Sequence, residues 1–236
     1  MKKLSLMFAG IMLIILTSGC MGLGSVSQGT SNQNETYNWE TSSDVKINIS
    51  AGEAHAIFTL AGSRSIKIYR HTEFQGNQPI RVHAVKFKYP NGTILEESQL
   101  TVQQKNSKTV ITAPVSEGKI AFTTTTQPKE FSIAISKQGS YHVILPTNMR
   151  IQEFILGSIQ PAGYSKKIIN DRVHLRWQSL RSGEIALEYY LQRDFYIFSG
   201  IVVFGIIAAI GGTIYFWYRI KQLKQNRKQS GIDIET

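Results

Sequence analysis

The chain has 236 residues and a formal net charge of +10 at pH 7, from 26 Lys and Arg against 16 Asp and Glu. Divided along the chain, the surplus is +2 in residues 1–20, +3 in 219–236 and only +5 across 21–194. That middle segment has no basic run interleaved with aromatic residues. The charge therefore predicts a mixed, solvated surface and excludes a nucleic-acid-binding protein.

The N-terminus has the pattern of a secretion signal. Lys2 and Lys3 precede a short apolar run, which has the length of a signal-peptide core and is short for a membrane span. The run ends at Thr17-Ser18-Gly19-Cys20, which resembles a lipobox, and Cys20 is the only cysteine. Residues 1–20 are predicted to be a signal peptide, with Cys20 as the lipidated mature N-terminus. The usual lipobox has Leu, Val or Ile at the position of Thr17, so an uncleaved signal anchor is the alternative.

Two compositions follow the signal peptide. Residues 21–43 are rich in Ser, Thr, Gly, Asn and Gln, which is typical of a flexible tether. From residue 44 to 194, apolar residues recur with a period of two, as in Val45-Ile47-Ile49, Phe131-Ile133-Ile135 and Val173-Leu175-Trp177. This pattern predicts an all-β fold, a sandwich-like exported domain over 44–194. Two smaller β units dividing near residues 113–114 are the alternative.

Local signals refine this β pattern. The alternation Ile80-Val82-Ala84 changes phase and continues as Val85-Phe87-Tyr89, which predicts a β-bulge. Pro90-Asn91-Gly92 predicts a tight hairpin turn directly afterwards. Residues 150–160 do not distinguish helix from strand.

A second apolar segment near the C-terminus is long enough to cross a membrane. Residues 195–218 contain no charged residue, and aromatic residues gather at both ends. Five Lys and Arg residues follow within 219–236. The positive-inside rule predicts a single-pass protein of the cell membrane, with 21–194 outside, a transmembrane helix over 195–218 and a basic cytoplasmic tail over 219–236.

Membrane lipid is therefore the first expected partner, and the predicted helix carries a signal for another. Gly205, Ala208, Ala209 and Gly212 fall at i, i+3, i+4 and i+7, so they form one stripe of small residues. Such stripes allow helix backbones to approach closely, which predicts a homo-oligomer or packing against a partner membrane protein. Ordinary membrane-helix composition is the alternative.

The exported segment contains no recognisable catalytic, cofactor-binding or metal-binding motif. Glu96 and Glu97 are adjacent, so on a strand they would point to opposite faces. The histidines are scattered singly and match no zinc motif; they are His55, His71, His83, His142 and His174. The sequence thus predicts no enzyme and no cofactor.

Two of the Asn-X-Ser/Thr triplets lie where a glycan would be tolerated. Asn34 falls in the predicted tether, and Asn91 falls at the predicted hairpin turn. If the source organism glycosylates exported proteins, these two asparagines are the predicted sites.

The stretch HLRWQSLRSGEIALEYYLQRDFYIFSG, residues 174–200, places a Trp-bearing strand and a Tyr-Tyr-Leu-Gln-Arg-Asp run directly before the span. Together with the lipobox-like leader, the polar tether and the β-rich exported domain, it resembles a group of archaeal single-span membrane proteins of unknown function. The resemblance implies location and architecture, and it supplies no catalytic or ligand-binding residue.

Taken together, these features predict a membrane-anchored cell-surface interaction or sensing module of unknown ligand. The final strand reaches the span through residues 192–194 alone, so strand and helix are expected to be mechanically coupled. An envelope structural or assembly lipoprotein without a specific ligand is the first alternative, and an extracytoplasmic hydrolase is the second.

Overall fold

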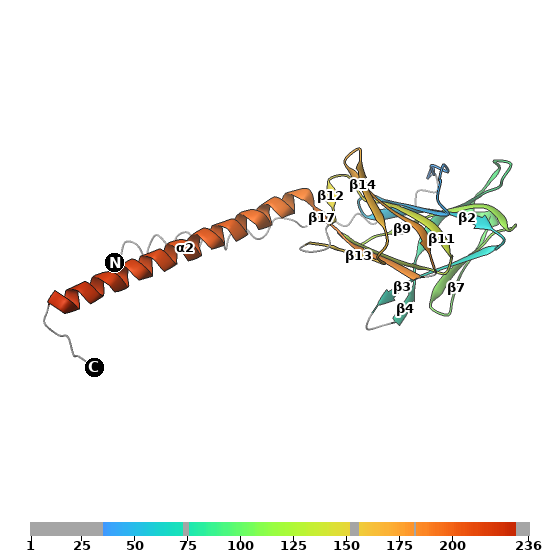
Figure 1. The fold of residues 1–236 in the computed structure, drawn as a ribbon. Coiled ribbons are helices and arrows are strands. Elements are labelled where there is room, and N and C mark those ends of the chain that lie inside the picture. The colour runs from blue at the N-terminus through green and yellow to red at the C-terminus, as the bar shows by residue number, and fades with distance from the viewer. Residues whose placement is uncertain (1–34, 73–75, 152–155, 182, 230–236) are drawn as a thin grey trace. The chain divides into compact units, whose positions relative to one another are not determined.

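The computed structural model describes residues 35–72, 76–151, 156–181 and 183–229 (Figure 1). Cys20 and Asn34 lie outside the described residues, as does the tether up to residue 34. The signal peptide, the lipidation of Cys20 and the glycosylation of Asn34 therefore stay predictions.

The described chain is mostly β with one long C-terminal helix, which confirms this much of the prediction. An eight-stranded sheet holds β14 (Ser165–Ile169), β15 (Arg172–Leu180), β11 (Gly139–Ile144), β1 (Val45–Ile49), β2 (Glu53–Ala61), β9 (Glu117–Thr125), β5 (Val82–Lys88) and β6 (Ile94–Leu95), in spatial order. Its strand pairs are antiparallel except for β1 and β11, which are parallel.

The other strands form two further sheets. A seven-stranded sheet holds β13 (Ser158–Gln160), β16 (Gly183–Glu188), β10 (Glu130–Ile135), β3 (Ser65–Thr72), β8 (Lys108–Thr112) and β7 (Thr101–Lys105), and β4 (Gly76–Pro79) pairs with β3. A two-stranded sheet joins β12 (Met149–Arg150) to β17 (Tyr190–Leu191). Arg150 and residues 158–160, from the segment that the sequence left ambiguous, are therefore extended.

The apolar positions of the period-two pattern form a core to which strands of both large sheets contribute. Val45, Ile47 and Ile49 of β1 are fully buried, while the residues between them are only half-buried. One hydrophobic cluster combines these side chains with residues of β3, β8, β10 and β16 from the seven-stranded sheet. Strands from both sides of residue 113 enter each sheet, since β5 pairs with β9 and β3 pairs with β10.

The predicted bulge and turn are both confirmed. On β5 the pairing with β9 shifts between His83 and Lys86, so two residues of β5 oppose one of β9. Ala84 takes a positive φ of 51° at this point. The turn that follows joins β5 to β6, and the amide of Gly92 donates to the carbonyl of Tyr89 at 3.0 Å.

The polar segment before β1 belongs partly to the folded domain. Tyr37 is only 8% exposed and packs with Ile57 and Ala121 against the eight-stranded sheet. Its hydroxyl donates to the carbonyl of Ala84 at 2.8 Å. Residues 35–43, which we name the strap, fall within the predicted flexible tether, yet the packed domain starts at the strap and not at residue 44. A single buried aromatic anchor holds it, and the polar composition around Tyr37 conceals that anchor.

The C-terminal helix α2 (Gln192–Gln229) continues directly from β17. It is the one helix of the described residues that is long and apolar enough to cross a membrane, with a mean hydropathy of 2.3 in its most apolar window and no buried residue there. The side chain of Lys129 reaches Asp194 at 2.7 Å, and the amide of Gln192 donates to the carbonyl of Asn148 at 3.1 Å. The helix thus leaves the β domain without a linker, as the sequence predicted.

Candidate functional site on the outer face of the eight-stranded sheet

The face of the eight-stranded sheet that points away from the core, here called the outer face, gathers basic side chains from distant parts of the chain. In the strand register, Lys46 of β1 pairs with His142 of β11, and His142 pairs with Arg176 of β15. The next outward row contains Ile144, which pairs with His174. The same row continues across the sheet on the same face: Asn48 of β1 pairs with His55 of β2, His55 pairs with Thr123 of β9, and Thr123 pairs with His83 of β5. Four of the five histidines therefore share one face.

His142 and His174 are in direct contact. The Nε2 atom of His142 lies 3.0 Å from the Nδ1 atom of His174, so the N–H of one ring donates a hydrogen bond to the nitrogen of the other. Burial, together with the neighbouring Arg176, His174 and Lys46, lowers the pKa of His142 to about 4. Burial also lowers the pKa of His174, with help from Arg172 and Arg176. Both rings are therefore neutral at pH 7, and the fixed positive charge of this region comes from its Lys and Arg side chains.

A depression of about 590 Å³ opens above this pair. Its lining includes one carboxylate, Glu40, and five basic side chains: Lys46, Lys119, His142, His174 and Arg176. A second depression of about 320 Å³ adjoins it, because both are lined by Lys46 and Ile144, and it adds Arg172. Among the described residues no carboxylate lies within ion-pair distance of Lys46, Lys119, Arg172 or Arg176.

The strap and the loop ends fix these cations in position. Lys46 donates to the carbonyl of Glu40 at 2.8 Å, and Lys119 donates to the carbonyl of Trp39 at 2.7 Å. Arg172 donates through Nε to the carbonyl of Leu145 at 2.8 Å and through Nη2 to that of Ile49 at 3.0 Å. These bonds satisfy some donors without supplying a carboxylate. Glu40 is the one acidic side chain in the lining of the larger depression, so positive charge outweighs negative charge there, which is the electrostatic character of an anion-binding surface.

A group of possible metal ligands lies at the edge of the same face. Glu35, Glu53 and His55 each bring one candidate ligand atom within 4.8 Å of the others. The Nδ1 atom of His55 is 2.9 Å from a carboxylate oxygen of Glu35, and the hydroxyl of Thr123 donates to that oxygen at 2.8 Å. The ion pair and this hydrogen bond account for the arrangement without a metal ion. Scattered in the sequence, these residues gave no metal-binding motif.

The residues that the sequence analysis singled out lie elsewhere. Asn91 is exposed at the turn between β5 and β6, and its side-chain oxygen accepts from the amide of Thr93 at 3.0 Å. Glu96 pairs with Lys86 at 3.2 Å, whereas Glu97 accepts from the amide of Val85, so the two carboxylates have separate roles. The stripe on α2 is mostly exposed, comprising Gly205, Ala208, Ala209 and Gly212. Glycosylation and helix association stay predictions.

Sequence reasoning missed the basic outer face altogether. Its members occupy outward positions of β1, β9, β11 and β15, with the polar strap laid across them. The only signal in the sequence is that the polar positions of these strands are often basic. That signal becomes a site only when the register places Lys46 beside His142, which is far away in the sequence.

Comparison with known proteins bears on the domain and the helix together. No curated protein matches the chain. The match to a protein family covers residues 41–235, and it therefore starts within the strap. The matched residues include both the β domain of this chain and its long apolar C-terminal helix. The chain belongs to DUF5803, a family of unknown function.

Proposed function

We propose that the protein is a membrane-anchored cell-surface interaction module, and that its β domain binds an anionic partner through the outer face of the eight-stranded sheet. In this proposal α2 crosses the cell membrane once, with the β domain outside and the C-terminus in the cytoplasm. The β domain is a sandwich of the two large sheets.

The observation that carries the proposal is the group of cations around the depression. Lys46, Lys119, Arg172 and Arg176 have no carboxylate within ion-pair distance among the described residues. A protein that needs only solubility intersperses charges of both signs, whereas a surface of one sign steers and binds oppositely charged partners. The neutral His142–His174 pair leaves the positive field to the surrounding Lys and Arg.

Support for the anchored arrangement comes from the junction. An interaction at the β domain can pass to α2 because β17 runs into the helix and the Lys129–Asp194 pair holds its first turn. The basic residues 219, 221, 224 and 227 follow the apolar part of α2 and support a cytoplasmic C-terminus.

The test is the binding of fluorescent poly-L-glutamate and of inorganic phosphate to the full chain in nanodiscs of phosphatidylcholine. Lys46→Glu with Arg176→Glu should weaken polyglutamate binding at least about tenfold, with a marked loss also on raising the salt concentration. Phosphate tests whether a small anion suffices for the depression.

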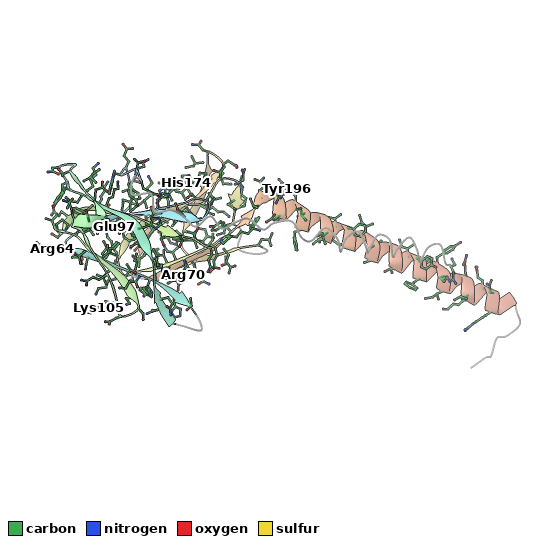
Figure 2. All side chains as sticks on the ribbon, turned by 180° about the vertical axis from the view of Figure 1, so that it is seen from behind. Arg64, Arg70, Glu97, Lys105, His174 and Tyr196 are labelled. Atoms are coloured by element: carbon green, nitrogen blue, oxygen red, sulfur yellow. The ribbon has the colours of Figure 1, made fainter. Side chains whose placement is uncertain are left out.

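The matched control reverses the same number of charges on the other sheet, by Lys67→Glu with Lys105→Glu. Both residues are exposed, and Lys105 and His174 lie on opposite sides of the β domain (Figure 2). The control should bind as the wild type does. Equal loss in both double variants would mean that net charge alone drives binding, and an absence of binding by the wild type to either anion would overturn the proposal.

A further inference from the structure

The hairpin of β14 and β15 exposes apolar side chains at an unusual place. Within the described part of the β domain, three large apolar side chains are exposed: Ile168 at 58%, Ile94 at 44% and Ile169 at 43%. Two of them are adjacent on β14, the edge strand of the eight-stranded sheet, in which every residue is exposed. Because β14 has one neighbouring strand, Ile168 and Ile169 stay uncovered although they point to opposite sides of the strand.

An ion pair and a strand pair connect this hairpin to the start of α2. The hairpin turns at residues 170 and 171, immediately after Ile169, and Asp171 forms an ion pair with Arg150 of β12. Arg150 pairs in turn with Tyr190 of β17, which stands two residues before the first residue of the helix. Figure 1 accordingly shows β12, β14 and β17 at the same end of the β domain.

The flanking residues have the chemistry of a membrane interface. Lys166 and Lys167 directly precede the two isoleucines and are exposed. Lysine next to apolar residues suits the boundary between headgroups and acyl chains, where the ammonium groups meet anionic lipids. Ile94 is the contrasting case. It follows the turn at residues 90–92, beside the start of β9. The helix lies toward the other end of β9, since the chain that leaves that end leads to Lys129 and its bond with Asp194.

We propose that the β14–β15 hairpin rests on the membrane surface from which α2 emerges, with Ile168 and Ile169 inserted among the lipid headgroups and Lys167 facing anionic lipid. The β domain is then held at two points, the helix and the hairpin. A second contact fixes its rotation about the helix axis and so fixes the direction in which the outer face points. The inference rests on the part of the proposed function in which α2 spans the membrane.

The experiment places one environment-sensitive fluorophore on the full chain carrying Cys20→Ser, in nanodiscs that hold one chain each and contain phosphatidylcholine and phosphatidylglycerol. The label is attached at Ile168→Cys, at Ile94→Cys as the matched exposed isoleucine, or at Ile207→Cys in α2. Lipids with a quencher in the headgroup region should quench the label at 168 several-fold more than the label at 94. Lys167→Gln should reduce that quenching only in discs that contain phosphatidylglycerol.

Each result separates the two proposals. A label at 207 that is quenched by lipids carrying a deep acyl-chain quencher, with labels at 168 and 94 quenched equally, overturns the hairpin contact and leaves the span in place. A label at 207 without deep quenching overturns the span itself. If the label at 168 shifts its emission only in discs holding two chains and is not quenched by lipid, β14 pairs with a second copy and the lipid contact is wrong. The intrinsic tryptophan fluorescence of the chain verifies that each variant is folded.

Discussion

On the inner face of the eight-stranded sheet, β1 presents Val45, Ile47 and Ile49 at 0% exposure, whereas on its outer face it presents Lys46 and Asn48, both half-buried. The inner positions require only an apolar side chain of suitable volume, and many sequences meet that requirement. The role of an outer position depends on the neighbouring strand, since Lys46 becomes part of the basic group only because His142 lies beside it.

The difference between the faces concerns what each contributes. The inner face supplies stability, because each buried apolar side chain contributes about 1.5 to 3 kcal/mol relative to exposure. The outer face collects like charges, which oppose folding, so its composition is better explained by binding than by stability. Substitutions on the two faces should therefore differ in both size and kind.

The largest effect is expected on the inner face, from Phe122→Ala. Phe122 is fully buried and stacks on Phe58 with ring centroids 5.6 Å apart. Removing the ring leaves a cavity between the sheets and should lower the free energy of unfolding by about 3 to 5 kcal/mol. Guanidinium unfolding of the full chain in detergent micelles, followed by its intrinsic tryptophan fluorescence, measures this loss. Thr125→Ala, at the exposed end of the same strand, is the control, and an equally small change in both would contradict the assigned core.

The outer face should instead respond to acid through His142. Its folded-state pKa of about 4 lies below the ordinary value of 6.5, so the unfolded chain binds the proton more tightly. The destabilising effect of His142 is therefore absent above pH 6.5. As the pH drops from 6.5 toward 4, the free energy of unfolding falls by about 2 to 3 kcal/mol.

The same unfolding measurement at a series of pH values checks this expectation. His142→Gln cannot take up a proton, so it should remove that part of the pH dependence and leave the rest, which other groups contribute. If the wild type and His142→Gln lose stability in parallel between pH 6.5 and 4, the outer face does not hold His142 in the neutral form.

These two faces also explain which features could be predicted from the sequence. The period of two predicted the buried positions, and its phase change at Ala84 and Val85 predicted the bulge, because each is a local property of the chain. The apolar helix was equally evident, since its length and hydropathy need no partner. The predicted span 195–218 falls inside α2, which extends from residue 192 to 229.

What the sequence could not predict depends on pairing between remote segments. His142 and His174 meet because β11 and β15 adopt one register, and both join Lys46 through the parallel pairing of β1 with β11. No local signal specifies that pairing. The strap escaped prediction for the opposite reason, since its polar composition outweighed its two aromatic residues, Tyr37 and Trp39, and Tyr37 makes its hydrogen bonds with residues far along the chain.

The bulge, where the alternation of the two faces changes phase, offers a smaller and sharper test. The amide of Val85, a buried residue, donates to the carboxylate of Glu97 at 3.1 Å. Glu97→Ala would leave this N–H without its acceptor and should cost about 2 kcal/mol, while Glu97→Gln keeps an acceptor and should cost less. Glu96→Ala is the control, because it removes the adjacent carboxylate, which is exposed and accepts no backbone hydrogen bond among the described residues but pairs with Lys86. Equal losses at both positions would contradict this role of Glu97.

The smallest effect is expected from Tyr37→Phe, which removes one hydroxyl from the strap. That hydroxyl donates to the carbonyl of Ala84 at 2.8 Å and lies 2.8 Å from the hydroxyl of Thr123. It therefore gives the Ala84 carbonyl, which lies in the bulge, a hydrogen-bond donor from the outer side of the sheet. Its loss should reduce the free energy of unfolding by about 1 kcal/mol, the usual net value of such a bond. Tyr89→Phe is the control, because the Tyr89 hydroxyl makes no hydrogen bond among the described residues. If both changes were neutral, the Tyr37 hydroxyl would not contribute to holding the strap, which would then depend on its other contacts, such as the bonds that Lys46 and Lys119 donate to strap carbonyls.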